Sequence, residues 1–192
     1  MHRRQPLPRL WLMTDERMGE NLWRALEAVP KGSGIVFRHY SLPRPERRRL
    51  FDRVRAIARR KRLVLLLAGS PKLAAAWGAD GSHGSDPVRG RRRTIRSMPV
   101  HNPRELVASR RARANLLFVS PVFATRSHPG GRPLGSIGLA DLTRQAHAPV
   151  VALGGVTHRS ARALKRCDIY GWAAIDAWST GASDQKRKAV PM

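Results

Sequence analysis

The sequence predicts an α/β protein, and more specifically a small closed (β/α)8 barrel, or TIM barrel. Short apolar segments alternate with longer amphipathic segments along most of the 192 residues, which is the pattern of strands alternating with helices. Strict alternation of this kind is typical of a parallel sheet. The segments Leu63–Leu67 and Pro149–Leu153 are apolar throughout, as expected of strands that are covered on both faces.

Eight segments have the length and composition of strands. They are Leu10–Met13, Gly34–Arg38, Leu63–Leu67, Asp80–His83, Thr94–Met98, Asn115–Ser120, Pro149–Leu153 and Tyr170–Ile175. Eight strand and helix units close a barrel, although a chain of this length needs short loops to do so. An open doubly wound sheet is the alternative. It would need fewer strands and a glycine-rich turn after the first of them, whereas no glycine follows Met13 before Gly19.

The segments between the strands have helical periodicity. They are Glu20–Val29, Glu46–Arg60, Pro71–Trp77, Pro103–Arg113, Leu139–His147 and His158–Arg166, with a shorter piece around Pro87–Arg93. Ser70, Asn102 and Thr157 each precede a predicted helix, and their side chains are of the type that caps a helix start. We expect residues 1–178 to form one domain and residues 179–192 to form a basic tail without regular structure.

The composition excludes several classes of protein. A hydrophobic content of 42% is too high for a disordered basic chain. The single Cys167 excludes an internal disulfide, and no cysteines and histidines have the spacing of a structural zinc site. The longest apolar run, Leu63–Ala68, is far shorter than the roughly 20 residues of a membrane-spanning helix. We therefore expect a soluble, unprocessed cytoplasmic protein that does not contact a membrane.

The charge is strongly positive, with 37 Lys and Arg against 13 Asp and Glu and a net charge of +24. Such a charge attracts phosphates and nucleic acids at low salt. The basic clusters are nevertheless spread over separate segments, and aromatic residues do not alternate with them as a base-stacking surface would require. We interpret most of the charge as the solvated faces of outer helices. An arginine-rich nucleic-acid-associated protein is an alternative, which clustering on one face would favour.

The most distinctive loop of the predicted barrel is the one after the seventh strand. In such barrels the functional residues lie on the loops that follow the C-terminal ends of the strands. Here the strand runs directly into Gly154 and Gly155 before a predicted helix. Two glycines leave backbone N–H groups bare beside the positive end of a helix, an arrangement that holds phosphate. The alternative interpretation is a tight turn with no ligand.

Six segments occur in an order that resembles a known family. They are Leu12–Glu16, Gly78–His83, His101–Glu105, Pro121–Thr125, Leu134–Gly135 and Pro149–Val156. Together they resemble the thiamine phosphate synthase and TenI-like family of small TIM barrels, from about Leu10 to Trp178. The resemblance implies a transferase of thiamine (vitamin B1) biosynthesis, which joins a hydroxymethylpyrimidine pyrophosphate to a thiazole phosphate. It also implies that Mg²⁺ and cationic side chains stabilise the leaving pyrophosphate.

The resemblance assigns roles to individual residues. Arg38 matches a basic residue beside the pyrophosphate. Thr125 and Arg126 fall in the pyrophosphate-binding stretch after the sixth strand, and Gly154 and Gly155 match the cradle of the thiazole phosphate. We therefore expect these five residues to bind phosphate, and Arg38 and Thr125 to take part in catalysis.

His83 and Asp86 complete the predicted site. His83 ends the fourth predicted strand and matches a family position, so a catalytic role and a packing role are both open. Asp86 follows three residues later and is the candidate ligand of Mg²⁺, provided that its loop reaches inward.

The chain departs from the family pattern at several positions. Ala68–Gly69 stands in place of an Asn-Asp pair whose Asp binds Mg²⁺, and Tyr40 and His128 stand in place of two lysines. Asp176 replaces a serine near the thiazole phosphate, and Ser120–Pro121 occupies the place of the histidine on which TenI-like tautomerases depend. Two interpretations therefore stay open besides nucleic-acid binding. One is a synthase that uses the two phosphorylated substrates, and the other is a non-catalytic, phosphate-binding or regulatory relative.

Overall fold

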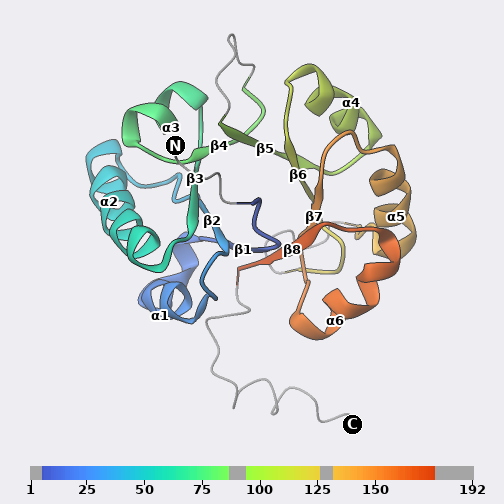
Figure 1. Cartoon of the computed structure of the whole chain (residues 1–192), viewed down its shortest axis with the longest axis horizontal. Coiled ribbons are helices and arrows are strands. Elements are labelled where there is room, and N and C mark those ends of the chain that lie inside the picture. The colour runs from blue at the N-terminus through green and yellow to red at the C-terminus, as the bar shows by residue number, and fades with distance from the viewer. Residues whose placement is uncertain (1–5, 87–93, 126–131, 176–192) are drawn as a thin grey trace.

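Eight parallel strands form a closed barrel in the computed structural model, which describes residues 6–86, 94–125 and 132–175 (Figure 1). The strands are β1 (Leu10–Met13), β2 (Gly34–Phe37), β3 (Val64–Ala68), β4 (Gly81–His83), β5 (Ile95–Val100), β6 (Leu116–Val119), β7 (Val150–Ala152) and β8 (Gly171–Ala174). Each strand pairs in parallel with the next, and β8 closes the barrel against β1, with Leu10 opposite Trp172. The predicted fold class is confirmed.

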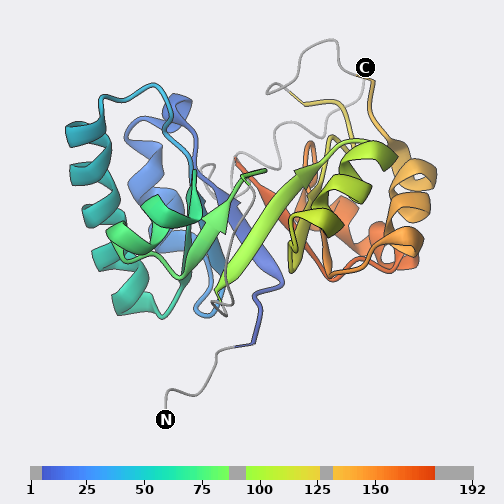
Figure 2. The same ribbon diagram turned by 90° about the horizontal axis from the view of Figure 1, so that it is seen from above.

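Helices surround the barrel. Among the described residues they are α1 (Asn21–Ala28), α2 (Arg44–Lys61), α3 (Pro71–Trp77), α4 (Pro103–Arg111), α5 (Gly135–Gln145) and α6 (His158–Ala163), with 3-10 turns η1 (Glu16–Met18) and η2 (Leu164–Cys167). Helices α1 to α3 lie on one side of the barrel and α4 to α6 on the other (Figures 1 and 2). The predicted helical piece Pro87–Arg93 and the tail 179–192 lie outside the described residues. No helix in the described part of the chain has both the length and the apolar character needed to cross a membrane.

The predicted helix caps are present. Ser70 Oγ accepts a hydrogen bond from the backbone N–H of Leu73 at 3.2 Å, and Asn102 Oδ1 accepts one from that of Glu105 at 3.0 Å. Thr157 caps α6 in the same way. Each cap satisfies a backbone donor that the first turn of a helix leaves without a partner. These local bonds explain why the starts of three helices could be read from the sequence.

Most boundaries differ from those predicted by one or two residues, and two of the differences have a cause in the sequence. β5 continues through Pro99 to Val100, whereas the sequence predicted an end at Met98 because proline lacks the N–H that a strand ladder uses. α5 begins at Gly135 rather than at Leu139. Its first turn contains two glycines, which are poor helix formers and conceal the start of the helix from a reading of periodicity.

Side chains fill the interior of the barrel. Trp11, Val36, Leu66 and Phe118 are fully buried there, and the Trp11 and Phe118 rings meet edge to face with centroids 5.5 Å apart. The Trp11 indole takes the space beside Gly34, where an added Cβ would lie 2.2 Å from Trp11 Cε3. A large residue on β1 thus fills the space left by a glycine on β2. The packed interior forms the floor beneath the rim where the strands end.

Candidate active site

The predicted site residues that the structure describes lie at one rim of the barrel. Arg38 directly follows β2, His83 ends β4, Thr125 lies in the loop after β6, and Gly154 and Gly155 come just after β7. Because all the strands are parallel, their C-terminal ends open on the same rim. The fold therefore brings together residues that are more than a hundred positions apart in the sequence.

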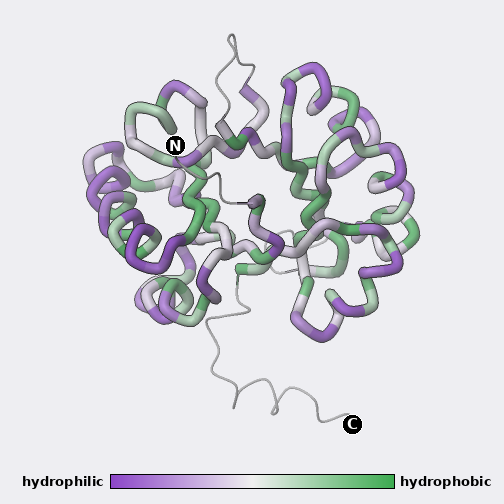
Figure 3. The backbone as a smooth tube through the Cα atoms, viewed as in Figure 1, coloured by the Kyte–Doolittle hydropathy of each residue, from purple (hydrophilic) through white to green (hydrophobic). Residues whose placement is uncertain are grey.

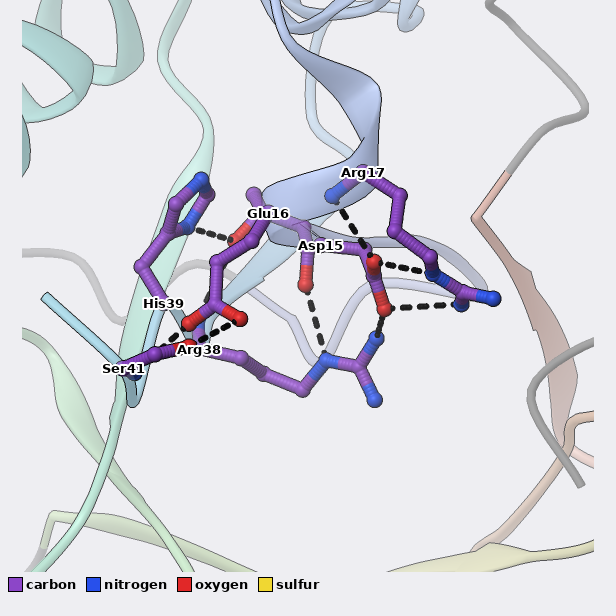
Figure 4. A network of polar contacts seen from close by, with 7 residues as sticks. Asp15, Glu16, Arg17, Arg38, His39 and Ser41 are labelled. Atoms are coloured by element: carbon purple, nitrogen blue, oxygen red, sulfur yellow. Dashed lines mark hydrogen bonds and ion pairs between the residues drawn. The ribbon is translucent and has the colours of Figure 1, made fainter.

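Arg38 lies across the ends of β1 and β2 (Figure 4). Its Nε donates a hydrogen bond to the carbonyl oxygen of Thr14 at 2.7 Å, and its Nη2 donates one to Asp15 Oδ2 at 2.6 Å. The side chain is 21% exposed, and its Nη1 makes no hydrogen bond to another described residue. The guanidinium is thus held in place while one of its edges is available to a ligand.

Asp15 holds Arg38 at this rim and was not selected by sequence reasoning. Its carboxylate accepts four hydrogen bonds: from Arg38 Nη2, and from the backbone N–H, Nε and Nη2 of Arg17. The hydrogen bonds from Arg17 and the charge of Arg38 hold the pKa of Asp15 below its usual range, so the carboxylate is ionised. The segment Leu12–Glu16 was part of the family resemblance, but no local pattern indicates which arginines its carboxylate would meet.

A second set of contacts ties the loop after β1 to the loop after β2. The backbone N–H and the hydroxyl of Ser41 donate to the two carboxylate oxygens of Glu16 at 2.8 and 2.5 Å, and these bonds lower the pKa of Glu16. The Thr14 hydroxyl lies 3.0 Å from Nδ1 of buried His39. Burial lowers the pKa of His39, so its ring stays neutral at pH 7. These contacts thus join the two loops around Arg38.

Arg47 joins the ends of β2 and β3 from the side of α2. Its Nη2 donates to the carbonyl oxygens of Arg38 and Ala68, both at 2.7 Å, and its Nε donates to that of Arg38 at 3.0 Å. The family pattern has an Asn-Asp pair at the end of β3, whereas Ala68–Gly69 offers only backbone groups there. One of these groups is already bonded to a guanidinium. This corner of the rim therefore carries a positive charge where the pattern has a carboxylate.

His83 is buried at the end of β4. The residue is 5% exposed, and its ring meets that of Phe118 edge to face at 5.2 Å. Ser97 Oγ donates its proton to the Ser82 carbonyl at 3.2 Å, so it accepts from His83 Nδ1 at 2.9 Å. Nε2 is then the unprotonated nitrogen. Burial lowers the pKa of His83 to about 3, so the imidazole is neutral at physiological pH and acts there as a hydrogen-bond acceptor.

This neutral state makes a prediction about stability. Below pH 6.5, the ordinary pKa of the ring, the unfolded chain binds a proton at His83 that the folded protein does not, so stability falls as the pH decreases. The expected loss is about 1.4 kcal/mol for each pH unit below that value. His83→Asn keeps a donor for Ser97 Oγ and does not titrate. Urea unfolding at about pH 7 and pH 5 should show a smaller pH-dependent loss for this variant, and equal losses would contradict the assignment.

Gly154 and Gly155 pack closely against the loop after β6. An added Cβ at Gly154 would lie 2.8 Å from Pro121 Cα, and one at Gly155 would lie 2.6 Å from the carbonyl oxygen of Ala124. Both residues have positive φ angles, of 89° and 64°. The backbone N–H groups of Gly154, Gly155 and Val156 donate no hydrogen bond to another described residue. Three consecutive amides are thus available at this corner, as the sequence predicted.

The free backbone N–H groups after β7 come from a different part of the chain than predicted. The helix predicted over His158–Arg166 is divided into α6 and η2, and α6 has only six residues. Its first turn is satisfied by a capping box between Thr157 and Ser160. The free donors therefore come from the loop before the helix and not from the helix end. Thr125 follows Ala124 and is half-buried, whereas Arg126 lies outside the described residues.

The described residues do not fit a protein-held Mg²⁺ ion. Mg²⁺ takes an octahedron of oxygen ligands, commonly including one or two carboxylates. Ala68–Gly69 supplies no side-chain oxygen, the carboxylate of Asp15 is saturated by arginines, and Asp86 is exposed on the surface. Within the described part of the chain, no three His, Cys, Asp or Glu residues form a group that could hold a metal. No group of described residues therefore supports the predicted role of Asp86 as a Mg²⁺ ligand. Asp176 and His128 lie outside the described residues.

Basic side chains occur on helices all around the barrel. They occupy α2, the last turn of α4, and α6 with η2, and hydrophilic residues alternate with hydrophobic ones in the helices on both sides of the barrel (Figure 3). Several are engaged locally: Arg48 pairs with Asp52 at 2.7 Å, and Arg53 lies 4.1 Å from the centre of the Trp23 ring. The described arginines do not gather on one face, so their distribution does not favour the nucleic-acid alternative.

Comparisons with known proteins cover nearly the whole chain. Residues 10–178 match the family described as thiamine monophosphate synthase. The thiamine-phosphate synthase of Salinispora arenicola is 32% identical over 96% of this chain and 95% of that protein. The thiamine-phosphate synthase of Chloroflexus aurantiacus is 29% identical over 88% of this chain and 84% of its own. Thiamine phosphate pyrophosphorylase from Pyrococcus furiosus shares the fold, with a TM-score of 0.75, 24% identity and coverage of 93% and 90%.

Proposed function

The chain belongs to the thiamine monophosphate synthase family, and we propose that it joins a hydroxymethylpyrimidine pyrophosphate to a thiazole phosphate, releasing pyrophosphate and forming thiamine phosphate. The observation that supports this proposal is that two groups able to bind an anion lie on one rim. One is the Arg38 guanidinium beside β1 and β2, and the other is the row of three amides after β7. A reaction between two phosphorylated molecules needs two such sites facing one space. The single free Cys167 suits the cytoplasm, where we place this reaction.

The proposed roles follow from the charges that develop. The C–O bond between the pyrimidine methylene carbon and the pyrophosphate breaks, and pyrophosphate leaves with the electron pair. The thiazole nitrogen then donates its lone pair to the resulting cation. Negative charge grows on the leaving oxygen, so a fixed cation beside it stabilises the transition state. In this proposal Arg38 supplies that cation, and the amides of Gly154 and Gly155 hold the thiazole phosphate. Thr125 supports the pyrophosphate from the loop after β6.

Magnesium, which the family resemblance implies, has no fitting set of protein ligands among the described residues. The neutralisation of pyrophosphate by protein groups is therefore assigned to guanidinium groups in this proposal. It follows that the wild-type protein should bind inorganic pyrophosphate in EDTA, as measured by calorimetry. A titration that shows heat only after Mg²⁺ is added would contradict this assignment.

The deciding experiment is a turnover assay with both phosphorylated precursors, in which thiamine phosphate is detected as its fluorescent oxidation product. Turnover by the wild type supports the proposal. The departure at Ala68–Gly69 favours a second candidate, a non-catalytic phosphate-binding relative. Binding of the thiazole phosphate without turnover, under conditions with and without Mg²⁺, would select that second candidate. Failure of both binding and turnover would leave the family membership as a matter of architecture alone.

A further inference from the structure

A carboxylate stands inside the proposed pyrophosphate site, where it would repel the anion. Asp15 is 16% exposed and lies 2.6 Å from Arg38 Nη2 and 2.6 Å from Arg17 Nε. At this distance a negative charge reduces the attraction that Arg38 exerts on a phosphate. The charge of Asp15 weakens anion binding, so the presence of this carboxylate requires a different explanation.

Capping of η1 explains only one of the four hydrogen bonds of Asp15. The backbone N–H of Arg17 donates to Oδ1 at 3.1 Å, which is the capping contact. The other three come from guanidinium nitrogens: Arg17 Nε on Oδ1, Arg17 Nη2 on Oδ2 and Arg38 Nη2 on Oδ2. Arg17 thus pairs with the carboxylate through two parallel bonds, and Arg38 shares the second oxygen. This geometry places two guanidinium groups from different loops side by side (Figure 4).

Pairing with Asp15 lowers the loss of side-chain entropy that the two arginines undergo when they bind an anion. An arginine loses up to about 2 kcal/mol of conformational freedom when one rotamer is selected. Arg17 is 55% exposed, and exposed arginines have many accessible rotamers. The bidentate pairing with Asp15 reduces this freedom before the ligand arrives. Arg17 and Arg38 carry two positive charges against the one negative charge of Asp15, so these three residues together keep a net positive charge that attracts an anion.

From these contacts we infer that Asp15 is a positioning residue, which orients Arg17 and Arg38 as a paired guanidinium site for pyrophosphate. The inference rests on the proposed function, because it assigns the pyrophosphate to this end of the rim. It adds Arg17 as a second contact of the anion and gives a reason for the carboxylate between the two arginines. The chemical class of the ligand is a diphosphate whose oxygens match the planar edges of two guanidinium groups.

The variant Asp15→Asn tests this inference through the sign of its effect. Asparagine caps a helical turn about as well as aspartate, so η1 is retained while the charge and one acceptor of the pairing are lost. If Asp15 acted only through its charge, its removal would strengthen the binding of inorganic pyrophosphate. If Asp15 positions the arginines, binding should weaken by about tenfold, the effect of one lost charge-assisted contact. Calorimetry with inorganic pyrophosphate in EDTA measures the difference.

Asp52 provides a matched control. It also lies between two arginines, with Arg48 Nε at 2.7 Å and Arg55 Nη2 at 3.3 Å, but on α2 outside the rim. Asp52→Asn changes the net charge of the protein by the same amount as Asp15→Asn. Its affinity for pyrophosphate should stay within about twofold of the wild type, because the pair is distant from the anion and screened by salt.

Arg17→Ala is the second test variant and does not depend on how Asp15 variants fold. We expect it to weaken pyrophosphate binding by about tenfold, since it removes one of the two guanidinium contacts. In turnover assays, both Arg17→Ala and Asp15→Asn should raise the KM of the pyrimidine pyrophosphate and leave that of the thiazole phosphate unchanged. A purely structural role would alter both KM values and the melting temperature together.

The outcomes separate the inference from the proposed function. If the wild type makes thiamine phosphate and Asp15→Asn binds pyrophosphate as tightly as the wild type or more tightly, the positioning role is wrong and the reaction stands. If the variants weaken pyrophosphate binding as expected but the wild type makes no thiamine phosphate, the reaction is wrong and the paired site stands. Weakening by Asp52→Asn equal to that by Asp15→Asn would also overturn the inference, because the effect would then not be local.

Discussion

Arg38→Ala is expected to lower the kcat/KM of the proposed transfer by about a hundredfold to a thousandfold, the usual cost of removing one group that stabilises developing charge. The guanidinium is held in one position by the Thr14 carbonyl and by Asp15, and the alanine variant has no cation at that position. Most of the loss should appear in kcat, because charge on the leaving pyrophosphate is larger in the transition state than in the bound substrate. Steady-state kinetics with each substrate varied in turn measures both parameters.

Two further variants show whether the loss is specific to the geometry of Arg38. Arg38→Lys keeps the charge but places it on a single nitrogen, without the planar guanidinium whose Nε and Nη2 bond Thr14 and Asp15 while Nη1 stays open, so we expect it to recover only a small part of the activity. Arg48→Ala removes an arginine that pairs with Asp52 on α2 and should leave kcat/KM within about twofold. An Arg38→Ala enzyme with near wild-type kcat would show that Arg38 does not stabilise the leaving pyrophosphate.

The strands and the starts of α3, α4 and α6 could be predicted because their signals are local. β1 was predicted over Leu10–Met13, as observed, since an apolar run is a property of consecutive residues. Ser70, Asn102 and Thr157 cap helices through bonds to residues three positions away. Such short-range contacts depend on sequence spacing alone. The glycine pair after β7 could be recognised for the same reason, because it directly follows an apolar run in the sequence.

The contacts of the site could not be predicted in this way because they depend on strand register. Asp15 and Arg38 are 23 positions apart, and they meet because Met13 lies opposite Val36 in the β1 and β2 pairing. A register shift of one residue would turn their side chains to opposite faces. Arg47 likewise reaches Ala68 only because β2 and β3 end side by side. Sequence reasoning therefore selected Arg38 by resemblance but missed the carboxylate that holds it.

The glycine pair after β7 gives the second prediction with a large effect. Gly155→Ala should destabilise the protein by about 2 to 4 kcal/mol and abolish measurable binding of the thiazole phosphate. The substituted residue would have to keep a φ of 64° while its Cβ lay 2.6 Å from the Ala124 carbonyl oxygen and 2.8 Å from Phe123 Cβ. The backbone must then move, which costs about 1 to 3 kcal/mol beyond the left-handed strain. The same movement displaces the amides that hold the phosphate.

Gly135 separates backbone strain from lack of space. Its φ of 65° is nearly identical to that of Gly155, but no atom lies within 4 Å of an added Cβ. Gly135→Ala therefore carries the left-handed strain alone, about 1 kcal/mol, and should bind the thiazole phosphate normally. Urea unfolding and calorimetry of the two variants, measured side by side, give the comparison. If the two alanine variants lose the same stability, the close approach of the loop after β6 does not constrain Gly155. If both variants retain binding of the thiazole phosphate, the position of the amides after β7 does not depend on that packing.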